Sequence, residues 1–256
     1  MNNQMLTLTS EQTQRYSRQL ILPEVGEAGQ LRLLQSSVVI VGAGGLGGPA
    51  ALFLAGCGVG RLVLVDGDRI HLSNLGRQII HQTEAIGQAK VASAARTLHG
   101  FNPHVRVETV DGWIDEENAD ALFSDADVVV DASDNFATRY LINATCHRLG
   151  KPLVTGAVLG FEGQVSVIRS GIHPRTPCYQ CLYPHIPSPD EAPTCMTAGV
   201  LGPLVGVVGT LQACETIKIL LNIGHVLDGE VLLINLLEGI FQRIRGRHNP
   251  ECAICA

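Results

Sequence analysis

Short aliphatic runs alternate along the chain with longer stretches that carry apolar residues at helical spacing, from Val38 to Val158. The runs with strand character are VVIV, RLVLVD, HVRVETV, ADVVVDAS and KPLVTGAV. The helical stretches between them are PAALFLAGCG, AKVASAARTLHG and ATRYLINATCHRLG. Strands that alternate with helices are typical of βαβ units. The pattern therefore predicts an α/β fold of Rossmann-like, doubly wound type, with a mostly parallel sheet covered on both faces.

Three later segments have strand character without such regular helices between them. They are GFEGQVSVIRS, EVLLINLLEG and FQRIRGR. We expect these segments to extend the sheet in antiparallel form. Ser10–Leu22 is predicted to form a single capped helix within an N-terminal helical arm, residues 1–35.

One segment interrupts this regular alternation. Six of the chain's twelve prolines lie between Gly171 and Cys195, and so long an irregular stretch inside a compact domain is usually functional or mobile. We interpret residues 1–256 as one domain that carries a proline-rich excursion over residues 171–196.

Composition narrows the classes of function. The chain has 46% apolar and only 16% charged residues, and its net charge is −6. Without a basic cluster, a nucleic-acid partner is not expected. The longest apolar run starts at Ala198 and contains four glycines and a proline over 14 residues, which favours a buried or interface helix over a membrane span. The first residues lack the pattern of a signal peptide, so we expect a cytoplasmic protein that is not bound to a membrane.

The stretch VVIVGAGGLGG places a glycine-rich turn directly after a predicted strand. Gly42, Gly44 and Gly47 fit the spacing G-x-G-x-x-G, and Asp66 ends the next predicted strand. Such glycines let the backbone approach a phosphate, and the following helix offers oriented N–H groups. The motif alone is compatible with NAD, with ATP or with a structural turn.

The residues after Asp66 favour a triphosphate. Asn74, Arg77 and Lys90 offer an amide and two cations near the carboxyl edge of the predicted sheet, which suits a triphosphate better than the pyrophosphate of NAD. The alternative is that Arg77 and Lys90 are surface charges that do not contact a ligand. In VVVDASDN, Asp134 lies where a magnesium ligand is expected, although it also qualifies as a helix N-cap.

Eight cysteines occur in the chain, and four of them form two C-x-x-C pairs. Two such pairs can complete a tetrahedral zinc site. The pairs are Cys178 with Cys181 and Cys252 with Cys255, so zinc would join the excursion to the C-terminal tail. A redox dithiol is the alternative. Cys195, just before the long apolar helix, is either a nucleophile or a loop cysteine without a covalent role.

The chain also resembles a known family. RYSRQ, GAGGLG, LVDGD, LSNLGRQ, GQAK, DASDN, CYQC, TCMTAGV and CAIC occur in this order between Arg15 and Cys255. Together they resemble the ThiF/MoeB/HesA family, whose members are similar to the adenylation domain of ubiquitin-activating enzymes. The resemblance implies a homodimer that uses MgATP to adenylate the C-terminal glycine of a ubiquitin-like sulfur carrier protein, with release of pyrophosphate. It also agrees with zinc at the four cysteines.

The resemblance assigns roles to individual positions. It implies that Arg18 reaches into the partner subunit's ATP site, that Asp66 holds the ribose, that Asp134 holds magnesium and that Cys195 engages the carrier's C-terminus or its sulfur. Arg18 is otherwise a charge on a helix face. The residues expected to contact the nucleotide are Gly42, Gly44, Gly45, Gly47, Asp66, Asp68, Ser73, Asn74, Leu75, Gly76, Arg77, Lys90, Asp134 and Asn135. The catalytic set is Arg18, Arg77, Lys90, Asp134 and Cys195.

The carrier itself is less well defined. HLSNLGRQ, GFEGQ and CYQCLYP are closer to ThiF than to MoeB, which favours a carrier of the thiamine thiazole pathway. The alternatives are a molybdopterin-type carrier or the carrier of another sulfur-containing metabolite. A cysteine desulfurase or a sulfurtransferase would supply the sulfur. Two other classes are compatible with parts of the sequence, a dehydrogenase and a non-catalytic carrier-binding scaffold. The presence of Arg18, Arg77, Lys90 and Asp134 argues against both.

Overall fold

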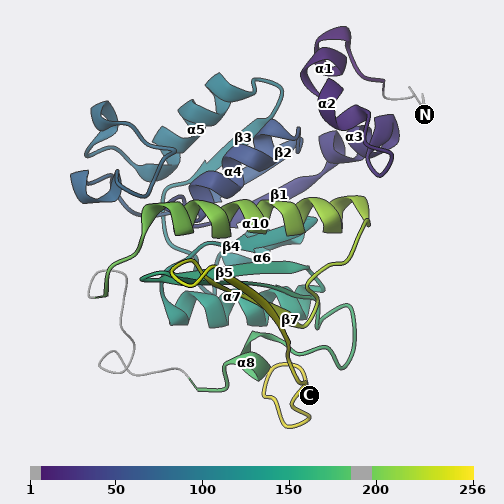
Figure 1. Ribbon diagram of the computed structural model, residues 1–256, viewed down its shortest axis with the longest axis vertical. Coiled ribbons are helices and arrows are strands. Elements are labelled where there is room, and N and C mark those ends of the chain that lie inside the picture. Colours follow the sequence, from purple (N-terminus) through teal and green to yellow (C-terminus); the bar gives the residue numbers. More distant parts are fainter. Residues whose placement is uncertain (1–6, 186–197) are drawn as a thin grey trace.

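The computed structural model describes residues 7–185 and 198–256 as one mixed sheet with helices on both faces (Figure 1). The strands are β1 Ser37–Val41, β2 Arg61–Val65, β3 Arg106–Val110, β4 Val128–Asp131, β5 Leu153–Leu159, β6 Glu162–Ile168, β7 Glu230–Asn235 and β8 Ile240–Arg245. Their order across the sheet is β3-β2-β1-β4-β5-β6-β7-β8. The pairs from β3 to β5 are parallel, and the pairs from β5 to β8 are antiparallel. The predicted α/β sheet and its antiparallel extension are therefore confirmed.

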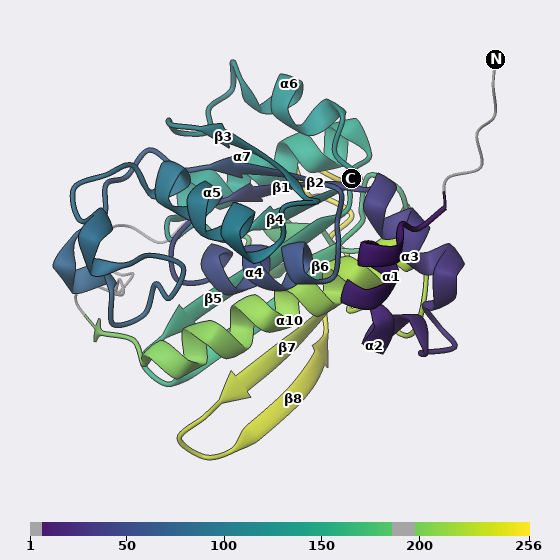
Figure 2. The ribbon, with the colours of Figure 1, turned by 90° about the horizontal axis from the view of Figure 1, so that it is seen from above.

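The helices alternate with the parallel strands and then give way to one long helix. They are α1 Ser10–Arg15, α2 Ser17–Leu20, α3 Gly26–Gln35, α4 Gly47–Gly56, α5 Lys90–Phe101, α6 Ala119–Ser124, α7 Phe136–Leu149, α8 Tyr179–Leu182 and α10 Gly202–Leu221. Two short 3-10 helices, η1 Leu72–Asn74 and η2 Thr83–Ala85, lie in the loop after β2. Figure 2 shows α4 and α10 on one face of the sheet, α6 and α7 on the other, and the β7–β8 hairpin extending away from the helices.

Alternating residues of the central strands build two separate cores. On β1, Val38 and Ile40 pack with α4 and α10. Val39 and Val41 face the opposite core, which contains residues of α6 and α7. All five residues of β1 are buried. Because both faces are covered, the strand reads as a continuous aliphatic run rather than as an alternation.

The N-terminal arm differs from the single predicted helix. Thr9, not a residue within Ser10–Leu22, caps α1: its hydroxyl accepts a hydrogen bond from the Gln12 N–H, and the Gln12 side chain accepts one from the Thr9 N–H. The chain then leaves helical geometry at Tyr16, whose ring is 2% exposed, and resumes in α2. The Tyr16 hydroxyl accepts a hydrogen bond from Asn102 at 3.0 Å. Burial of this tyrosine explains the break.

Helix α10 extends further than the 14-residue apolar run. It covers 20 residues, long and apolar enough by composition to cross a membrane, but 56% of its most apolar window is buried inside the protein. Gly209 lies against α4 so closely that a methyl group there would meet the Leu46 carbonyl oxygen at 2.3 Å. The buried Glu215 accepts a hydrogen bond from the Leu227 N–H at 3.0 Å. These contacts agree with the predicted buried helix.

Candidate active site

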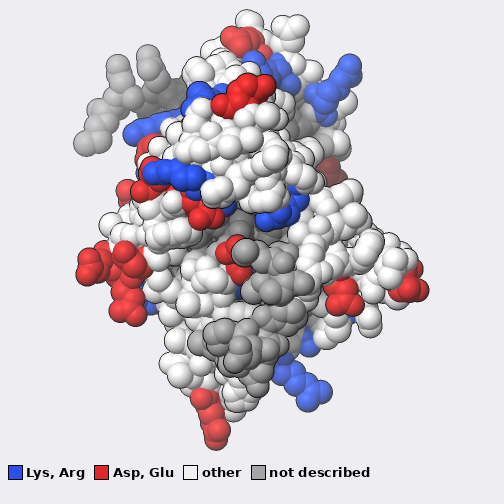
Figure 3. Space-filling view, turned by 90° about the vertical axis from the view of Figure 1, so that its left-hand side faces the viewer, with Lys and Arg blue, Asp and Glu red and all other residues white. Residues whose placement is uncertain are grey.

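A cavity of about 810 Å³ opens where the parallel strands end, at the point where the strand order reverses between β1 and β4. Its first half is formed by the glycine-rich loop after β1 and by residues that follow β2, β3 and β4. Its second half is formed by β5 to β8, by Tyr179 and Tyr183, and by Val200 and Val205. Figure 3 views the molecule from this side and shows Lys and Arg side chains interspersed with Asp and Glu. The cavity therefore joins a polar half to a more apolar half.

The glycine loop is fixed by close backbone contacts. Gly42 has a φ of 99°, and a Cβ there would meet the Ala132 carbonyl oxygen at 2.5 Å. A Cβ on Gly47 would lie 1.8 Å from the Gly42 carbonyl oxygen. Gly42, Gly44 and Gly45 line the cavity, whereas Gly47 does not. Gly47 is thus required for the close packing of α4 against the loop, and its contact with a nucleotide stays a prediction.

Two buried side chains, Asp66 and His81, hold the backbone N–H and the carbonyl oxygen of the loop residue Ala43. Its N–H donates to Oδ2 of Asp66 at 2.8 Å, and its carbonyl oxygen lies 2.9 Å from Nε2 of His81. Oδ1 of Asp66 accepts a second hydrogen bond from the Asp68 N–H at 2.8 Å. Burial lowers the pKa of His81, and neighbouring Lys90 lowers it further. The neutral ring then donates from Nε2 to Ala43 and accepts at Nδ1 from Ser93, 3.1 Å away.

Lys90 is the most enclosed cation of the polar half. Its side chain is 8% exposed and its Nζ lies 2.6 Å from Oδ2 of Asp68, a carboxylate that is 50% exposed. Both residues line the cavity, as does Arg77, whose Nη1 donates to the Ser73 carbonyl oxygen at 3.0 Å. Arg77 and Lys90, two of the sequence-predicted cations, therefore lie at one site.

Four other predicted contacts are not on the cavity wall in this conformation. Ser73, Asn74, Leu75 and Gly76 form or follow η1, and none of them lines the cavity. Oδ1 of Asn74 accepts a hydrogen bond from the His71 N–H at 3.0 Å, so its amide is engaged within its own turn. The motif LSNLGRQ therefore contributes to the cavity through Arg77 and Gln78, at its end.

Asp134 and Asn135 follow β4 and line the cavity opposite Asp66 in the strand order. Asn135, not Asp134, caps α7: its Oδ1 accepts from the Thr138 N–H at 2.9 Å. The N-cap alternative for Asp134 is therefore wrong by one residue. Within residues 7–185 and 198–256, no hydrogen bond or ion pair engages the exposed Asp134 carboxylate.

Arg18 lies outside this site. It is an exposed residue of α2, and Figure 1 shows α2 at the end of the molecule opposite to the loops that follow the parallel strands. It is absent from the residues that line the cavity. The chain's own Arg18 therefore does not reach its own cavity.

Three buried residues of the site were missed from the sequence: Gln78, which is 5% exposed and lines the cavity, His81, described above, and Arg139 in the first turn of α7. Arg139 lines the cavity, is 8% exposed, and donates from Nη2 to the Ser133 carbonyl oxygen at 2.9 Å. Burial opposes its charge, but Asp131 and Tyr179 outweigh burial and raise the pKa of Arg139. A buried guanidinium without a directly bonded carboxylate suits an anionic ligand, yet nothing in ATRYLINA distinguishes it from an ordinary surface arginine.

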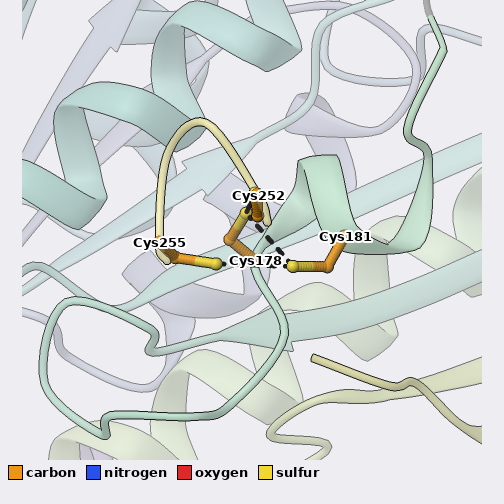
Figure 4. Close-up of side chains that lie close together, drawn as sticks. All are labelled: Cys178, Cys181, Cys252 and Cys255. Atoms are coloured by element: carbon orange, nitrogen blue, oxygen red, sulfur yellow. Dashed lines mark hydrogen bonds between the residues drawn. The ribbon is translucent and has the colours of Figure 1, made fainter. Parts of the chain in front are cut away.

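The four paired cysteines converge. Figure 4 shows Cys178 and Cys181, at the start of α8, facing Cys252 and Cys255 from the C-terminal tail. All four sulfur atoms lie within 4.8 Å of one another, with Sγ–Sγ distances of 3.6 Å for Cys178 to Cys252 and 3.4 Å for Cys181 to Cys255. A tetrahedral Zn²⁺ with bonds of about 2.3 Å separates its ligand sulfurs by about 3.8 Å. The cluster therefore fits a metal ion, and the predicted convergence of the two pairs is confirmed.

Cys195, predicted as a nucleophile, lies outside the described residues, as does part of the excursion over 171–196. The part that is described contains α8 and the first cysteine pair. Tyr179 of this part is 2% exposed, and its N–H donates to Oδ1 of Asn143 on α7 at 2.9 Å. The excursion is thus anchored to α7 next to Arg139.

The sequence pattern of the ThiF family matches residues 16–254, nearly the whole chain. This protein belongs to the ThiF family. The chain is 48% identical over 250 residues to the SAMP-activating enzyme E1 of Haloferax volcanii, covering 98% of this chain and 91% of that protein. It is 48% identical over 252 residues to the sulfur carrier protein adenylyltransferase of Thermus thermophilus, covering 96% and 92%.

Other relatives are longer or more distant. The chain is 46% identical over 257 residues to the adenylyltransferase and sulfurtransferase MOCS3 of Anopheles gambiae, covering 99% of this chain but 57% of that protein. Among solved structures, E. coli MccB bound to ATP has a TM-score of 0.80 at 23% identity, over 94% of this chain and 74% of that one. At this identity the likeness shows that the ThiF-family chain shares the MccB fold.

Proposed function

We propose that this protein adenylates the C-terminal carboxylate of a ubiquitin-like sulfur carrier protein with MgATP, releasing pyrophosphate. The observation that carries the proposal is one cavity of about 810 Å³ that joins the glycine loop, Lys90, Arg77 and Asp134 to a more apolar half. The names of the two relatives at 48% identity support the same activity.

ATP fits the polar half better than NAD does. Lys90 and Arg77 supply two cations near the glycine loop, and the N-terminus of α4 directs N–H groups to the same place. A triphosphate carries the additional charge that these cations can neutralise, whereas a dehydrogenase would leave them idle.

The reaction demands alignment and charge neutralisation more than covalent chemistry. A carboxylate oxygen of the carrier attacks the α-phosphorus, the bond from this phosphorus to the pyrophosphate oxygen breaks, and the electron pair leaves with pyrophosphate. Lys90 and Arg77 neutralise the charge that grows on the leaving group. Magnesium, when held at Asp134, supplies further neutralisation of the phosphates. Asp66 retains unoccupied lone pairs, although it already accepts from two backbone N–H groups, and would hold the ribose.

The carrier's C-terminal tail would occupy the second half of the cavity. This half is lined by the backbone and side chains of β5 and β6, such as Val158 and Gly163, and by Leu233 of β7. Arg139 lies at the same cavity beside the loop that carries Asp134. Its guanidinium would offset the negative charge that the carboxylate and the phosphates bring together.

Arg18 would act across a homodimer. Because it lies at the opposite end of its own molecule, it can reach an ATP site only in a partner subunit. The cavity of one subunit would then be completed by the arginine of the other. Two composite sites per dimer follow from this arrangement.

The four-cysteine cluster would hold a structural zinc ion. All four ligand positions are provided by protein sulfur, which leaves no position open for a substrate. Cys195 would engage the activated carrier or its sulfur after adenylation, and a cysteine desulfurase or sulfurtransferase would supply that sulfur.

The identity of the carrier is a finer proposal. The ThiF-like motifs favour a thiamine-type carrier. The names SAMP-activating enzyme and MOCS3 among the relatives favour another ubiquitin-like carrier, and neither name mentions thiamine. A molybdopterin-type carrier is therefore the second candidate.

ATP–pyrophosphate exchange tests the activity and the carrier together. The assay is run with a thiamine-type carrier, with a molybdopterin-type carrier and without a carrier. Exchange that depends on one carrier supports adenylation and identifies the pathway. A matched control is the same carrier without its last residue, because it lacks the correctly placed carboxylate. ATP binding without exchange on any ubiquitin-like carrier would contradict the proposal.

A further inference from the structure

The chain's single tryptophan, Trp113, lies at the polar half of the cavity. It is 62% exposed, while the next residue, Ile114, is 8% exposed and belongs to the core. A large aromatic side chain that stays exposed beside a buried neighbour and lines a cavity is typical of a ligand contact.

The indole lies flat enough against the loop after β2 to exclude a side chain there. A Cβ on Gly67 would meet Cε2 of Trp113 at 2.7 Å and its Nε1 at 2.9 Å. Gly67 stands between Asp66 and Asp68, the residues that hold the glycine loop and Lys90. The backbone of Trp113 is fixed in turn, because its carbonyl oxygen accepts from Nδ2 of Asn118 at 2.9 Å.

The sheet order gives the distance scale. The glycine loop follows β1, Asp66 follows β2, and Trp113 follows β3, and these three strands are consecutive neighbours. Neighbouring strands lie about 4.8 Å apart, so the end of β3 lies about 10 Å from the end of β1. Phosphate, ribose and base of a nucleotide extend over a similar length in the same order.

We propose that the indole of Trp113 is the stacking platform for the base of the bound nucleotide. This inference rests on the proposed function, because it takes the glycine loop as the phosphate end of the site. Gly67 supports one face of the ring, and the exposed remainder of the ring is available to the base. A purine offers a larger stacking area than a pyrimidine, so the platform favours ATP over pyrimidine triphosphates.

The experiment uses the full chain and two ligands, one with a nucleoside and one without. Because Trp113 is the only tryptophan, intrinsic tryptophan fluorescence reports on this position alone. We expect ATP to change the emission at saturation, and inorganic tripolyphosphate to bind the polar half with a much smaller change. Calorimetry of the same titrations gives both affinities.

Variants separate stacking from folding. Trp113→Ala is expected to weaken ATP binding about tenfold or more and to raise the KM for ATP in pyrophosphate exchange with little change in kcat. Its affinity for tripolyphosphate should stay that of the wild type. Trp113→Phe should retain most of the ATP affinity, whereas Trp113→Leu, which keeps the apolar bulk without the aromatic face, should not. Gly67→Ala should reproduce the Trp113→Ala defect by displacing the ring.

Equal ATP affinity of the wild type and Trp113→Ala, with ATP bound by both, would overturn this inference alone. Failure of the wild type to bind ATP would overturn the proposed function as well. An equal loss of tripolyphosphate affinity in Trp113→Ala would also overturn the inference, since the residue would then support the loop and not the base.

Discussion

The glycine loop and the cysteine cluster are both built from short motifs, but they are held in opposite ways. The loop is fixed by its own protein neighbours: Gly42 against Ala132, and Ala43 between Asp66 and His81. The cluster brings together four sulfur atoms from segments 74 residues apart, and its sulfurs contact mainly one another. The loop therefore has its shape before a ligand arrives, whereas the cluster would derive its stability from the proposed zinc ion.

The largest effect is expected at the cluster. Cys178→Ser removes one of four ligands, so the variant should lose its metal and several kcal/mol of stability, less than the about 10–16 kcal/mol of zinc-finger peptides because the sheet has its own core. Metal analysis should find about one zinc per chain in the wild type. Hydrogen exchange should locate the loss in α8 and the tail. Cys146→Ser, a buried cysteine outside the cluster, is the control and should retain the metal. A folded wild-type protein purified without zinc would contradict the assignment.

Asp134→Asn tests the nucleotide site. There, we expect a substitution to reduce activity without reducing the stability of the fold. The carboxylate is exposed and unpaired among the described residues, so its loss should leave the melting temperature unchanged. We expect pyrophosphate exchange to fall by a factor of about 100 or more, or about 3 kcal/mol, because phosphate charge is no longer neutralised. Asp120→Asn, a partly exposed carboxylate that is paired with Arg148 and does not line the cavity, is the matched control. Full exchange activity of Asp134→Asn would contradict the proposal that Asp134 is a magnesium ligand.

Gly47→Ala should destabilise the protein by about 3 kcal/mol, since the new methyl group would overlap the Gly42 carbonyl oxygen. Gly76→Ala is the matched comparison, because nothing lies within 4 Å of a Cβ at that position. Chemical denaturation of both variants measures the difference. Equal stability of the two would show that the loop is not held by the close contact at Gly47.

The smallest effect concerns His81. Burial lowers its folded-state pKa below 6.5, so between these two values the unfolded chain binds more protons than the folded one. The contribution of His81 is complete above 6.5 and is lost as the pH falls toward the lower, folded-state pKa. His81→Phe should cost about 1 kcal/mol near neutral pH and flatten this pH dependence. Denaturation curves of both proteins, measured between pH 6.5 and the lower folded-state pKa, test this prediction. If the variant kept the wild-type pH dependence of stability, another group would be responsible for it.

The fold and the site differ in how much the sequence reveals. Buried parallel strands read clearly, because residues such as Val38 and Val39 face two different cores and both must be apolar. The cysteine pairs are equally clear, since each C-x-x-C lies within one turn. The two N-terminal helices read as one, because the break depends on the burial of Tyr16 against Asn102, a contact over 86 residues.

The missed site residues have the same physical cause. His81 acts through a contact to Ala43, 38 residues away, and Arg139 lies at a cavity that distant strands form; neither residue belongs to a motif with its own spacing. Trp113 reads as a packing residue until the close approach to Gly67 is seen. Conversely, Ser73 to Gly76 belong to a strong motif, but in this conformation they do not line the cavity, and Asn74 bonds to His71 at the start of its own turn.

Strand β8 has a consequence for handling the protein. It is the edge of the sheet, and all six of its residues are exposed, including Phe241 and Ile244. An exposed apolar edge invites a second chain to add its own strand, and charged side chains on the edge are the usual protection. Arg243 and Arg245 provide such charges here. Replacing both with neutral residues would turn the hairpin into a starting point for aggregation at high concentration, although neither arginine lines the cavity.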